Sequence, residues 1–282
     1  MGISYLNLSF FAIIVCMKAI LLTGVSGGIG IEIAKKFSCE DYVVFGLDIK
    51  EPQEEIKNLT FIKTDLTKEV EVRNAFNIVK ESGYQLEEII SAAGIYDLNS
   101  LIEMSEEDFI KIFNINVFAM YRVNKIFLPL LNEKGKIIMI SSELGPLDHL
   151  PFTGIYGITK STVEKYAYSL RMELQLLGYQ VVLIRPGAID TGLINVSVDK
   201  LDRFTRDTKY YQYNSKKFLK IVNSVENKKI HPSKLANLIY KVSFKKKPRY
   251  VYKINRNFLL LVLNALPQHF QNWVIKKILT SK

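Results

Sequence analysis

The chain has 282 residues, a formal net charge of +10 and a hydrophobic fraction of 48%. This length and composition fit one large α/β domain with a sizeable core, and they exclude a disordered or low-complexity chain. Two cysteines are too few for a disulfide framework, and three scattered histidines give no metal-ligand spacing. We therefore expect free thiols, a cytoplasmic location and no metal ion.

The first 16 residues form an apolar leader, and no Lys or Arg precedes Lys18. A signal peptide needs a charged start. A buried strand follows the leader at once, which leaves almost no linker for a spanning helix. We predict that residues 1–16 are an extension that is not part of the fold. The main domain is expected over 17–254, followed by an apolar and basic helical tail over 255–282.

A glycine-rich turn follows the first predicted strand. The apolar run Lys18–Leu22 precedes Thr23-Gly24-Val25-Ser26-Gly27-Gly28-Ile29-Gly30, and a helical pattern begins at Ile29. Strand, glycine turn and helix in this order form the context that a dinucleotide site requires. Glycines let the backbone approach a pyrophosphate, and the helix amino terminus offers free N–H groups.

Tyr156 and Lys160 lie one turn apart in a segment that is predicted to be helical through about Leu177. A four-residue step places both side chains on one helical face. We expect the Lys160 ammonium to lower the pKa of the Tyr156 phenol, because a nearby positive charge favours the phenolate. Such a phenol gives or takes a proton near neutral pH, as carbonyl–alcohol interconversion requires.

Apolar, strand-like segments alternate with helix-like segments along the chain. This order favours a doubly wound α/β fold, in which a seven-stranded, mostly parallel sheet carries helices on both faces, as in a Rossmann fold. The strands are expected over 18–23, 42–48, 60–64, 86–92, 135–141, 180–185 and 249–252.

The glycine turn and the Tyr156/Lys160 pair together resemble the short-chain dehydrogenase/reductase family, from about Met17 to Tyr252. The resemblance covers most of the chain. The opening pattern of the family is matched by Thr23, Gly24, Gly28 and Gly30. The later motifs are matched by Asp65, Ser91-Ala92-Ala93-Gly94 (without the customary asparagine), Asn116, Ser142, and Pro186-Gly187 with Thr191.

The resemblance implies a catalytic set formed by Asn116, Ser142, Tyr156 and Lys160. It implies that Ser142 holds the substrate oxygen by a hydrogen bond and that Tyr156 transfers the proton. Lys160 would also bind the nicotinamide ribose, and Asn116 would hold a water molecule that links Lys160 to solvent. The implied activity is hydride transfer between a nicotinamide cofactor and an alcohol or ketone.

Two of these assignments have a rival of the same residue type. Ser141 lies next to Ser142, and Asn114 lies two residues before Asn116. We prefer Ser142, although its gap to Tyr156 is slightly longer than the family commonly shows. We prefer Asn116 because the family motif places a valine directly after the asparagine.

The family pattern also implies a cofactor site, in which Asp48 has a special role. Asp48 lies about twenty residues past the glycine turn, where an acid accepts hydrogen bonds from the adenosine ribose and repels a 2′-phosphate. We therefore favour NAD(H) over NADP(H). The residues expected to hold the cofactor are Gly24, Ser26, Gly28, Ile29, Gly30, Asp48, Asp65, Leu66, Ala92, Ala93, Gly94, Tyr156, Lys160, Pro186, Gly187, Ile189 and Thr191.

The tail contains the apolar run Asn257–Pro267 and a second apolar helix with Lys276 and Lys277 on another face. The run is too short to span a bilayer. We expect residues 257–279 to close the substrate pocket or pack between subunits, with peripheral membrane contact as the alternative. No nucleic-acid motif accompanies the basic residues, so no nucleic-acid partner is expected. Substrate identity is expected to depend on a mobile lid over 191–230.

The favoured function is an oxidoreductase that acts on a small, apolar alcohol or ketone. Two alternatives stay open: an epimerase or dehydratase that acts on nucleotide sugars, and a cofactor-binding regulatory protein without turnover. The chain has little room after the seventh strand for a sugar-nucleotide domain, which disfavours the first alternative. By resemblance to the family, we expect a homodimer or homotetramer that pairs through helices over 105–131 and 156–177.

Overall fold

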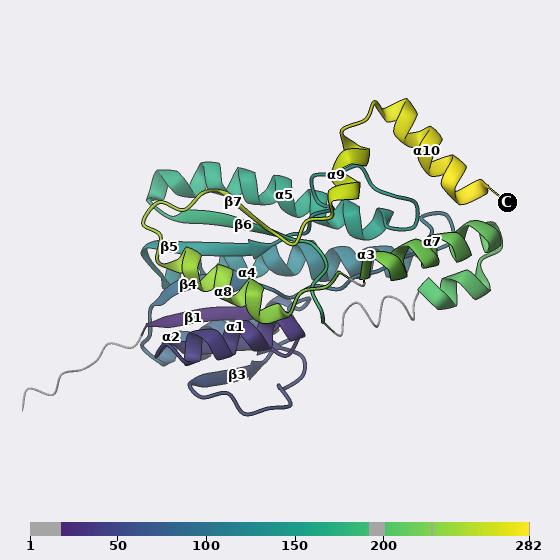
Figure 1. The fold of residues 1–282 in the computed structure, drawn as a ribbon. Helices are drawn as coiled ribbons and strands as arrows, with labels where there is room; N and C mark the ends of the chain where they lie inside the picture. The colour runs from purple at the N-terminus through teal and green to yellow at the C-terminus, as the bar shows by residue number, and fades with distance from the viewer. Residues whose placement is uncertain (1–17, 192–200, 227, 282) are drawn as a thin grey trace, which may run out of the picture.

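The computed structural model describes residues 18–191, 201–226 and 228–281 (Figure 1). Within these residues a central sheet carries helices on both faces, and the C-terminal helices lie beyond one edge of it (Figure 1). The predicted leader over 1–16 and the part of the predicted lid over 192–200 lie outside the described residues.

The described residues form one sheet of seven strands in the order β3-β2-β1-β4-β5-β6-β7, and every pairing in it is parallel. This confirms the predicted doubly wound fold. The fifth strand begins at Leu131 rather than at 135. The strands are β1 Ala19–Thr23, β2 Val43–Asp48, β3 Leu59–Lys63, β4 Leu86–Ser91, β5 Leu131–Ile140, β6 Gln180–Pro186 and β7 Val251–Ile254.

Both faces of the sheet are covered, which explains why its central strands are apolar throughout instead of alternating. In β1 every side chain is buried. Phe127 lies in the core on one face and Phe37 in the core on the other. The first core is covered by α2 Glu69–Glu81, α4 Ala119–Phe127 and α5 Gly154–Leu174, and the second by α1 Gly28–Ser38 and α8 Pro232–Ser243.

The helical segment before β5 is interrupted. It begins with α3 Glu106–Phe113, where the Ser105 side chain accepts a hydrogen bond from the Asp108 N–H at 3.1 Å and acids fill the first turn. Both features stabilise a helix start. A π-helix over Asn114–Phe118 follows and leads into α4. A 3-10 turn over Leu128–Leu130 then ends the segment.

The C-terminal helices form a third apolar cluster outside the sheet. It gathers Phe152, Phe204, Phe218 and Leu279 from loops and helices that lie far apart in the sequence. Its helices are α7 Gln212–Glu226 and α10 Gln268–Thr280, with a further helical stretch over 201–207. The short helix α9 Phe258–Asn264 lies between β7 and α10 in the sequence. No helix among the described residues combines the length and the hydropathy needed to cross a membrane.

Candidate active site

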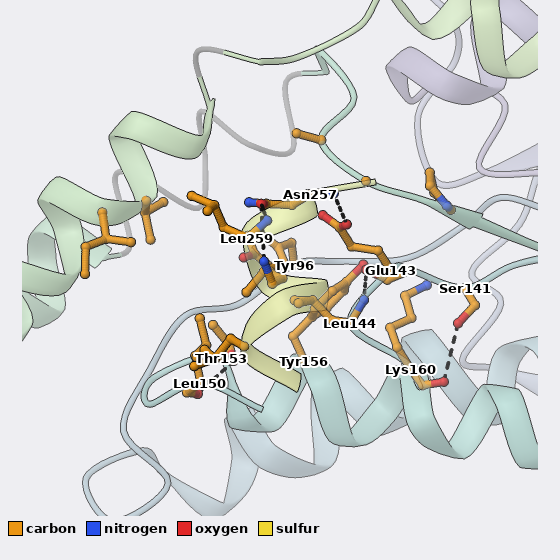
Figure 2. Close-up of a pocket in the computed structure, with 18 of the residues that line it drawn as sticks. Tyr96, Ser141, Glu143, Leu144, Leu150, Thr153, Tyr156, Lys160, Asn257 and Leu259 are labelled. Carbon is orange, nitrogen blue, oxygen red and sulfur yellow. Dashed lines mark hydrogen bonds between the residues drawn. The ribbon is translucent and has the colours of Figure 1, made fainter. Parts of the chain in front are cut away.

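The candidate site lies where the strand order reverses between β1 and β4. In open parallel sheets, ligands bind at this point beyond the carboxyl ends of the strands. The loops that follow β4, β5 and β6 line a cavity of about 610 Å³ there, together with Ile29 in the first turn of the helix after β1. The helices α9 and α10 form its outer wall, and Figure 2 shows α9 passing close to Tyr156 and Leu144.

The glycine turn is tightly closed, so two of its residues admit no side chain. Gly24 has a φ of +72°, and a Cβ there would lie 2.7 Å from the Ala93 backbone. A Cβ on Gly30 would lie 2.0 Å from the Gly24 carbonyl oxygen. The turn ends at Gly28, where α1 begins and its unpaired N–H groups face the cavity edge. These features fit the pyrophosphate of a dinucleotide.

Asp48 ends β2 beside the glycine turn. One carboxylate oxygen accepts the Ser26 N–H at 3.1 Å, and the other accepts the Ile49 N–H at 2.7 Å. The Ser26 hydroxyl donates to the Lys50 carbonyl. These bonds hold a negative charge in place next to the turn, as the prediction for the adenosine ribose requires.

The end of β4 lies directly against the end of β1. The Ala93 N–H donates to the Thr23 hydroxyl at 3.2 Å, and Ala92 and Gly94 line the cavity. Asp65 follows β3, and its carboxylate accepts hydrogen bonds from the backbone and the hydroxyl of Thr67. The neighbouring Leu66 side chain is buried in the core, so only its backbone is available to a cofactor.

Asn116 lies in the π-helix and is 1% exposed, whereas Asn114 is partly exposed. Its carbonyl oxygen accepts the Ile95 N–H at 2.8 Å, and its amide donates to the Ile95 carbonyl and to the Thr159 hydroxyl. The Asn116 amide thus fixes the loop after β4 against α5. The sequence pattern did not indicate the π-helix that turns this side chain inward.

Tyr156 projects from the first turns of α5 into the cavity (Figure 2). The Tyr96 ring packs edge-on against it, with 4.4 Å between centroids. Ser141 and Ser142 both line the cavity, but the Ser142 side chain is hydrogen-bonded with Tyr156, whereas the Ser141 hydroxyl donates to the Lys160 carbonyl at 3.5 Å. Of the two serines, Ser142 is therefore the one placed beside Tyr156.

The Tyr156 phenol is not acidified by Lys160, contrary to our expectation. Burial raises the pKa of Tyr156 to about 12, and a hydrogen bond with Ser142 opposes this shift. The Lys160 ammonium lies 5.6 Å from the centroid of the Tyr156 ring and donates to the Ile140 carbonyl at 3.0 Å. Burial lowers the pKa of Lys160 itself to about 8. Loss of solvation therefore outweighs the attraction between ammonium and phenolate.

The loop after β6 completes the cavity. A Cβ on Gly187 would lie 1.8 Å from the Asn255 carbonyl oxygen, so only glycine fits there. Thr191 lies across the cavity edge, and a Cβ on Gly28 would lie 3.2 Å from its side chain. The predicted residues that line the cavity are Ile29, Ala92, Gly94, Ser142, Tyr156, Lys160, Pro186, Gly187, Ile189 and Thr191. The predicted residues outside this lining are Gly24, Ser26, Gly28, Gly30, Asp48, Asp65, Leu66, Ala93 and Asn116.

Glu143 was not assigned to the site from the sequence, whereas the tail was expected to close the pocket or to pack between subunits. Glu143, directly after Ser142, is 7% exposed and accepts the Asn257 N–H at 2.7 Å. The apolar wall from α9 and α10 includes Leu260 and Leu263, which confirms that the tail borders the pocket. Phe152, beside the lining residue Pro151, has a φ of +65°. Its ring packs on those of three aromatic residues, Phe204, Tyr211 and Phe218.

Comparisons with known proteins agree with this geometry. The family model described as short chain dehydrogenase matches residues 18–202. The chain is 31% identical to 3-ketodihydrosphingosine reductase of Bacteroides thetaiotaomicron, over 92% of this chain and 97% of that protein. It is 28% identical to estradiol 17-beta-dehydrogenase 2 of Mus musculus, over 92% of this chain and 74% of that protein.

A solved structure shows the same fold. A short-chain dehydrogenase from Streptomyces avermitilis superposes with a TM-score of 0.71 at 20% identity, covering 92% of this chain and 97% of that one. The family expected from the motifs is confirmed by the family model and by the relatives. The chain belongs to the short-chain dehydrogenase family and is a nicotinamide-dependent oxidoreductase of alcohol and ketone groups.

Proposed function

We propose that this enzyme reduces the carbonyl group of a long, apolar ketone, with NADH as the preferred reductant. The observation that carries the proposal is the difference between the residues that line the two ends of the cavity. Its inner end holds Ser142, Tyr156 and Lys160, and its outer wall consists of apolar side chains from α9 and α10. A ketone carbon can thus lie beside the phenol while its hydrocarbon chain extends along the helices.

Each residue at the inner end has a proposed role. Tyr156 gives its proton to the substrate oxygen, and Ser142 positions that oxygen through a hydrogen bond. A bound nicotinamide supplies the hydride. Lys160 places a positive charge beside the ring of Tyr156, and Asn116 fixes the loop that packs on Thr159, next to Lys160. The raised pKa of Tyr156 keeps the phenol in the protonated form that the reduction step uses.

Asp48 supports the preference for NADH. Its carboxylate is held by backbone N–H groups of Ser26 and Ile49, so a 2′-phosphate placed here would meet a fixed negative charge. We propose that the cofactor lies along Gly24–Gly30, Asp65–Leu66 and Ala92–Gly94, with its nicotinamide near Pro186, Gly187, Ile189 and Thr191. Replacement of Asp48 by Asn should lower the ratio of kcat/KM for NADH to that for NADPH by about 10-fold.

The substrate class is supported by the relatives as well as by the cavity. The Bacteroides thetaiotaomicron relative is named for reduction of a keto group on a sphingoid chain, and the Mus musculus relative is named for dehydrogenation of a steroid. Both names denote large apolar substrates. The direct test is oxidation of NADH and NADPH by the purified full chain with 3-ketones of increasing chain length. Turnover that rises with chain length supports the proposal, and cofactor binding without turnover of any ketone contradicts it.

Exposed apolar side chains on two helical segments support contact between copies of the chain. Phe118 and Tyr121 on the α3–α4 segment and Tyr168 and Met172 on α5 are 45–53% exposed, which supports pairing of two or four copies through these helices. Sedimentation equilibrium tests this assembly. A monomer at micromolar concentration would contradict it.

We also propose peripheral contact of the tail with an anionic membrane, for an enzyme located in the cytoplasm. Phe258, Phe270 and Trp273 are 42–73% exposed, and Lys277 lies 4.9 Å from the Trp273 ring centroid. Apolar side chains flanked by lysines favour the interface of an acidic bilayer. Co-sedimentation with phosphatidylglycerol vesicles, compared with phosphatidylcholine vesicles, tests this contact. If the same fraction of the protein sediments with vesicles as without them, the proposed membrane contact is contradicted.

A further inference from the structure

The cavity contains one negatively charged group that the hydride-transfer chemistry does not use. Among its described lining residues, Glu143 provides the only carboxylate, and Lys160 provides the only ammonium. The Lys160 ammonium points to the Ile140 carbonyl on the buried side. Among the described lining residues, none therefore offers Glu143 an opposite charge, and the positive charge of Arg256 acts on it from outside the lining. A half-compensated carboxylate beside an apolar wall is stabilised when a ligand supplies a further partner.

The Glu143 side chain is held in a fixed position at the inner end of the cavity. Its backbone N–H donates to the Pro186 carbonyl at 2.8 Å, which ties the residue to the loop after β6. One carboxylate oxygen, Oε2, accepts the Asn257 N–H at 2.7 Å. Figure 2 shows this bond between the loop after β5 and the start of α9. The carboxylate thus lies between the inner residues and the apolar wall.

The second carboxylate oxygen, Oε1, is available to a ligand. Within the part of the chain that the structure describes, no residue donates a hydrogen bond to it. Burial raises the pKa of Glu143, and the positive charge of Arg256 partly opposes this shift. A hydrogen-bonded cation would stabilise the carboxylate.

We propose that Oε1 of Glu143 binds an ammonium group on the carbon next to the reacting carbonyl, so that the preferred substrates are long-chain α-amino ketones. This inference rests on the proposed ketone reduction. Ser142, to which we assign the carbonyl oxygen, and Glu143 both line the cavity, and the inference places the group on the adjacent carbon at the carboxylate. In this arrangement the hydrocarbon chain extends toward α9. The Glu143 carboxylate also contacts the start of α9, because it accepts the N–H of Asn257.

The kinetic test compares two ketones of equal chain length, one with an α-amino group and one without it. For the wild-type enzyme we expect kcat/KM for the amino ketone to exceed that for the amine-free ketone by about 10- to 100-fold, because a charge-assisted hydrogen bond is lost in the second. Glu143→Gln keeps the size and the acceptor for Asn257 but removes the charge. We expect the ratio to fall below about 3-fold in this variant.

Two control variants separate recognition from structure. Glu81→Gln neutralises an exposed glutamate at the end of α2 and should leave the ratio unchanged. Asn257→Ala removes the side-chain cap of α9, which accepts the Leu259 N–H at 3.0 Å, and should lower kcat/KM for both ketones alike. A ratio near one in the wild type, or a ratio that Glu143→Gln leaves unchanged, would overturn the assignment.

A binding measurement keeps the inference testable without turnover. Calorimetry of the full chain with a long-chain primary amine and with the alcohol of equal length should give about 10-fold tighter binding of the amine, and Glu143→Gln should abolish the difference. Equal affinities in the wild type would overturn the ammonium site. Absence of ketone turnover together with a Glu143-dependent amine preference would instead contradict only the proposed reaction.

Discussion

The two ends of the cavity are built on different principles. The inner end includes Gly187 and lies beside the glycine turn with Gly24, two positions where a Cβ would meet backbone atoms at 1.8 Å and 2.7 Å. The outer end is formed by apolar side chains from α9 and α10, such as Leu260 and Leu263, which other apolar residues could replace. The comparison teaches that the backbone of the inner end is specified by local sequence, whereas the outer wall is assembled from side chains of distant segments.

The largest effect is expected for the proton donor at the inner end. Tyr156→Phe removes the hydroxyl and keeps the ring that packs on Tyr96. We expect kcat to fall by about 10²–10⁴-fold, because a positioned proton donor contributes that much. Cofactor affinity, measured by NADH fluorescence, should change less than about 3-fold, since the glycine turn is untouched. If the variant keeps most of its kcat, Tyr156 is not the proton donor.

A second large effect is expected in the glycine turn. Gly30→Ala places a Cβ 2.0 Å from the Gly24 carbonyl oxygen, so the backbone must shift. We expect loss of measurable cofactor binding and a decrease of about 1–3 kcal/mol in the free energy of unfolding. Gly27→Ala is the matched control in the same turn, because its Cβ would lie 3.4 Å from the same oxygen. Equal losses of stability in both variants, measured by urea denaturation, would show that close approach is not the cause.

A smaller effect is expected at the outer end. Leu263→Ala shortens one side chain of the apolar wall. We expect kcat/KM to fall by about 10-fold for long-chain ketones and by less than 2-fold for short ones, in line with the transfer free energy of the lost methylene groups. Leu176→Ala, at a site that is 81% exposed and remote from the cavity, serves as the control. An equal decrease for short and long ketones would contradict an apolar chain-binding wall.

The smallest effect on catalysis is expected at Glu88, which lies in β4 away from the cavity lining. Burial raises its pKa from 4.5 to about 7, and the Ser243 hydroxyl donates to it at 2.7 Å. The folded state therefore binds the proton more tightly than the unfolded state. Its contribution to stability is fully present below about pH 4.5 and is lost as pH rises from 4.5 to 7.

Glu88→Gln should remove this pH dependence. We expect the variant to exceed the wild type by about 1–3 kcal/mol in the free energy of unfolding at pH 8, and by much less at pH 5, with kcat unchanged. Urea denaturation at the two pH values measures the difference. Replacement of the exposed Glu107 by Gln is the control. A variant destabilised equally at both pH values would show that Glu88 is not a buried, titrating acid.

Much of the inner end could be predicted from the sequence, because each motif is local. The glycine turn needs particular residues at fixed spacing, and the Tyr156/Lys160 step needs only helical geometry. The strands were predictable for a similar reason, since burial on both faces makes each one a continuous apolar run. The proposed chemical roles of the residues still follow from the family resemblance, and the variants above test them.

Other features could not be read from local patterns. The pKa direction of Tyr156 was wrong because desolvation depends on how completely the surrounding loops enclose the phenol. The carboxylate of Glu143 acquires its position through Asn257, more than a hundred residues later in the chain. The inward turn of Asn116 depends on a π-helix, for which no sequence signal was recognised. All three are properties of long-range packing.

Phe152, whose backbone is left-handed, belongs to the third apolar cluster and lies just before α5. A bulky residue with a φ of +65° carries a cost of about 1–3 kcal/mol. The rings of Phe204, Tyr211 and Phe218 hold Phe152 in this conformation. The first turn of α5, which carries Tyr156, begins two residues later. The backbone that leads into the Tyr156 turn is therefore stabilised by aromatic packing from residues more than fifty positions further along the chain.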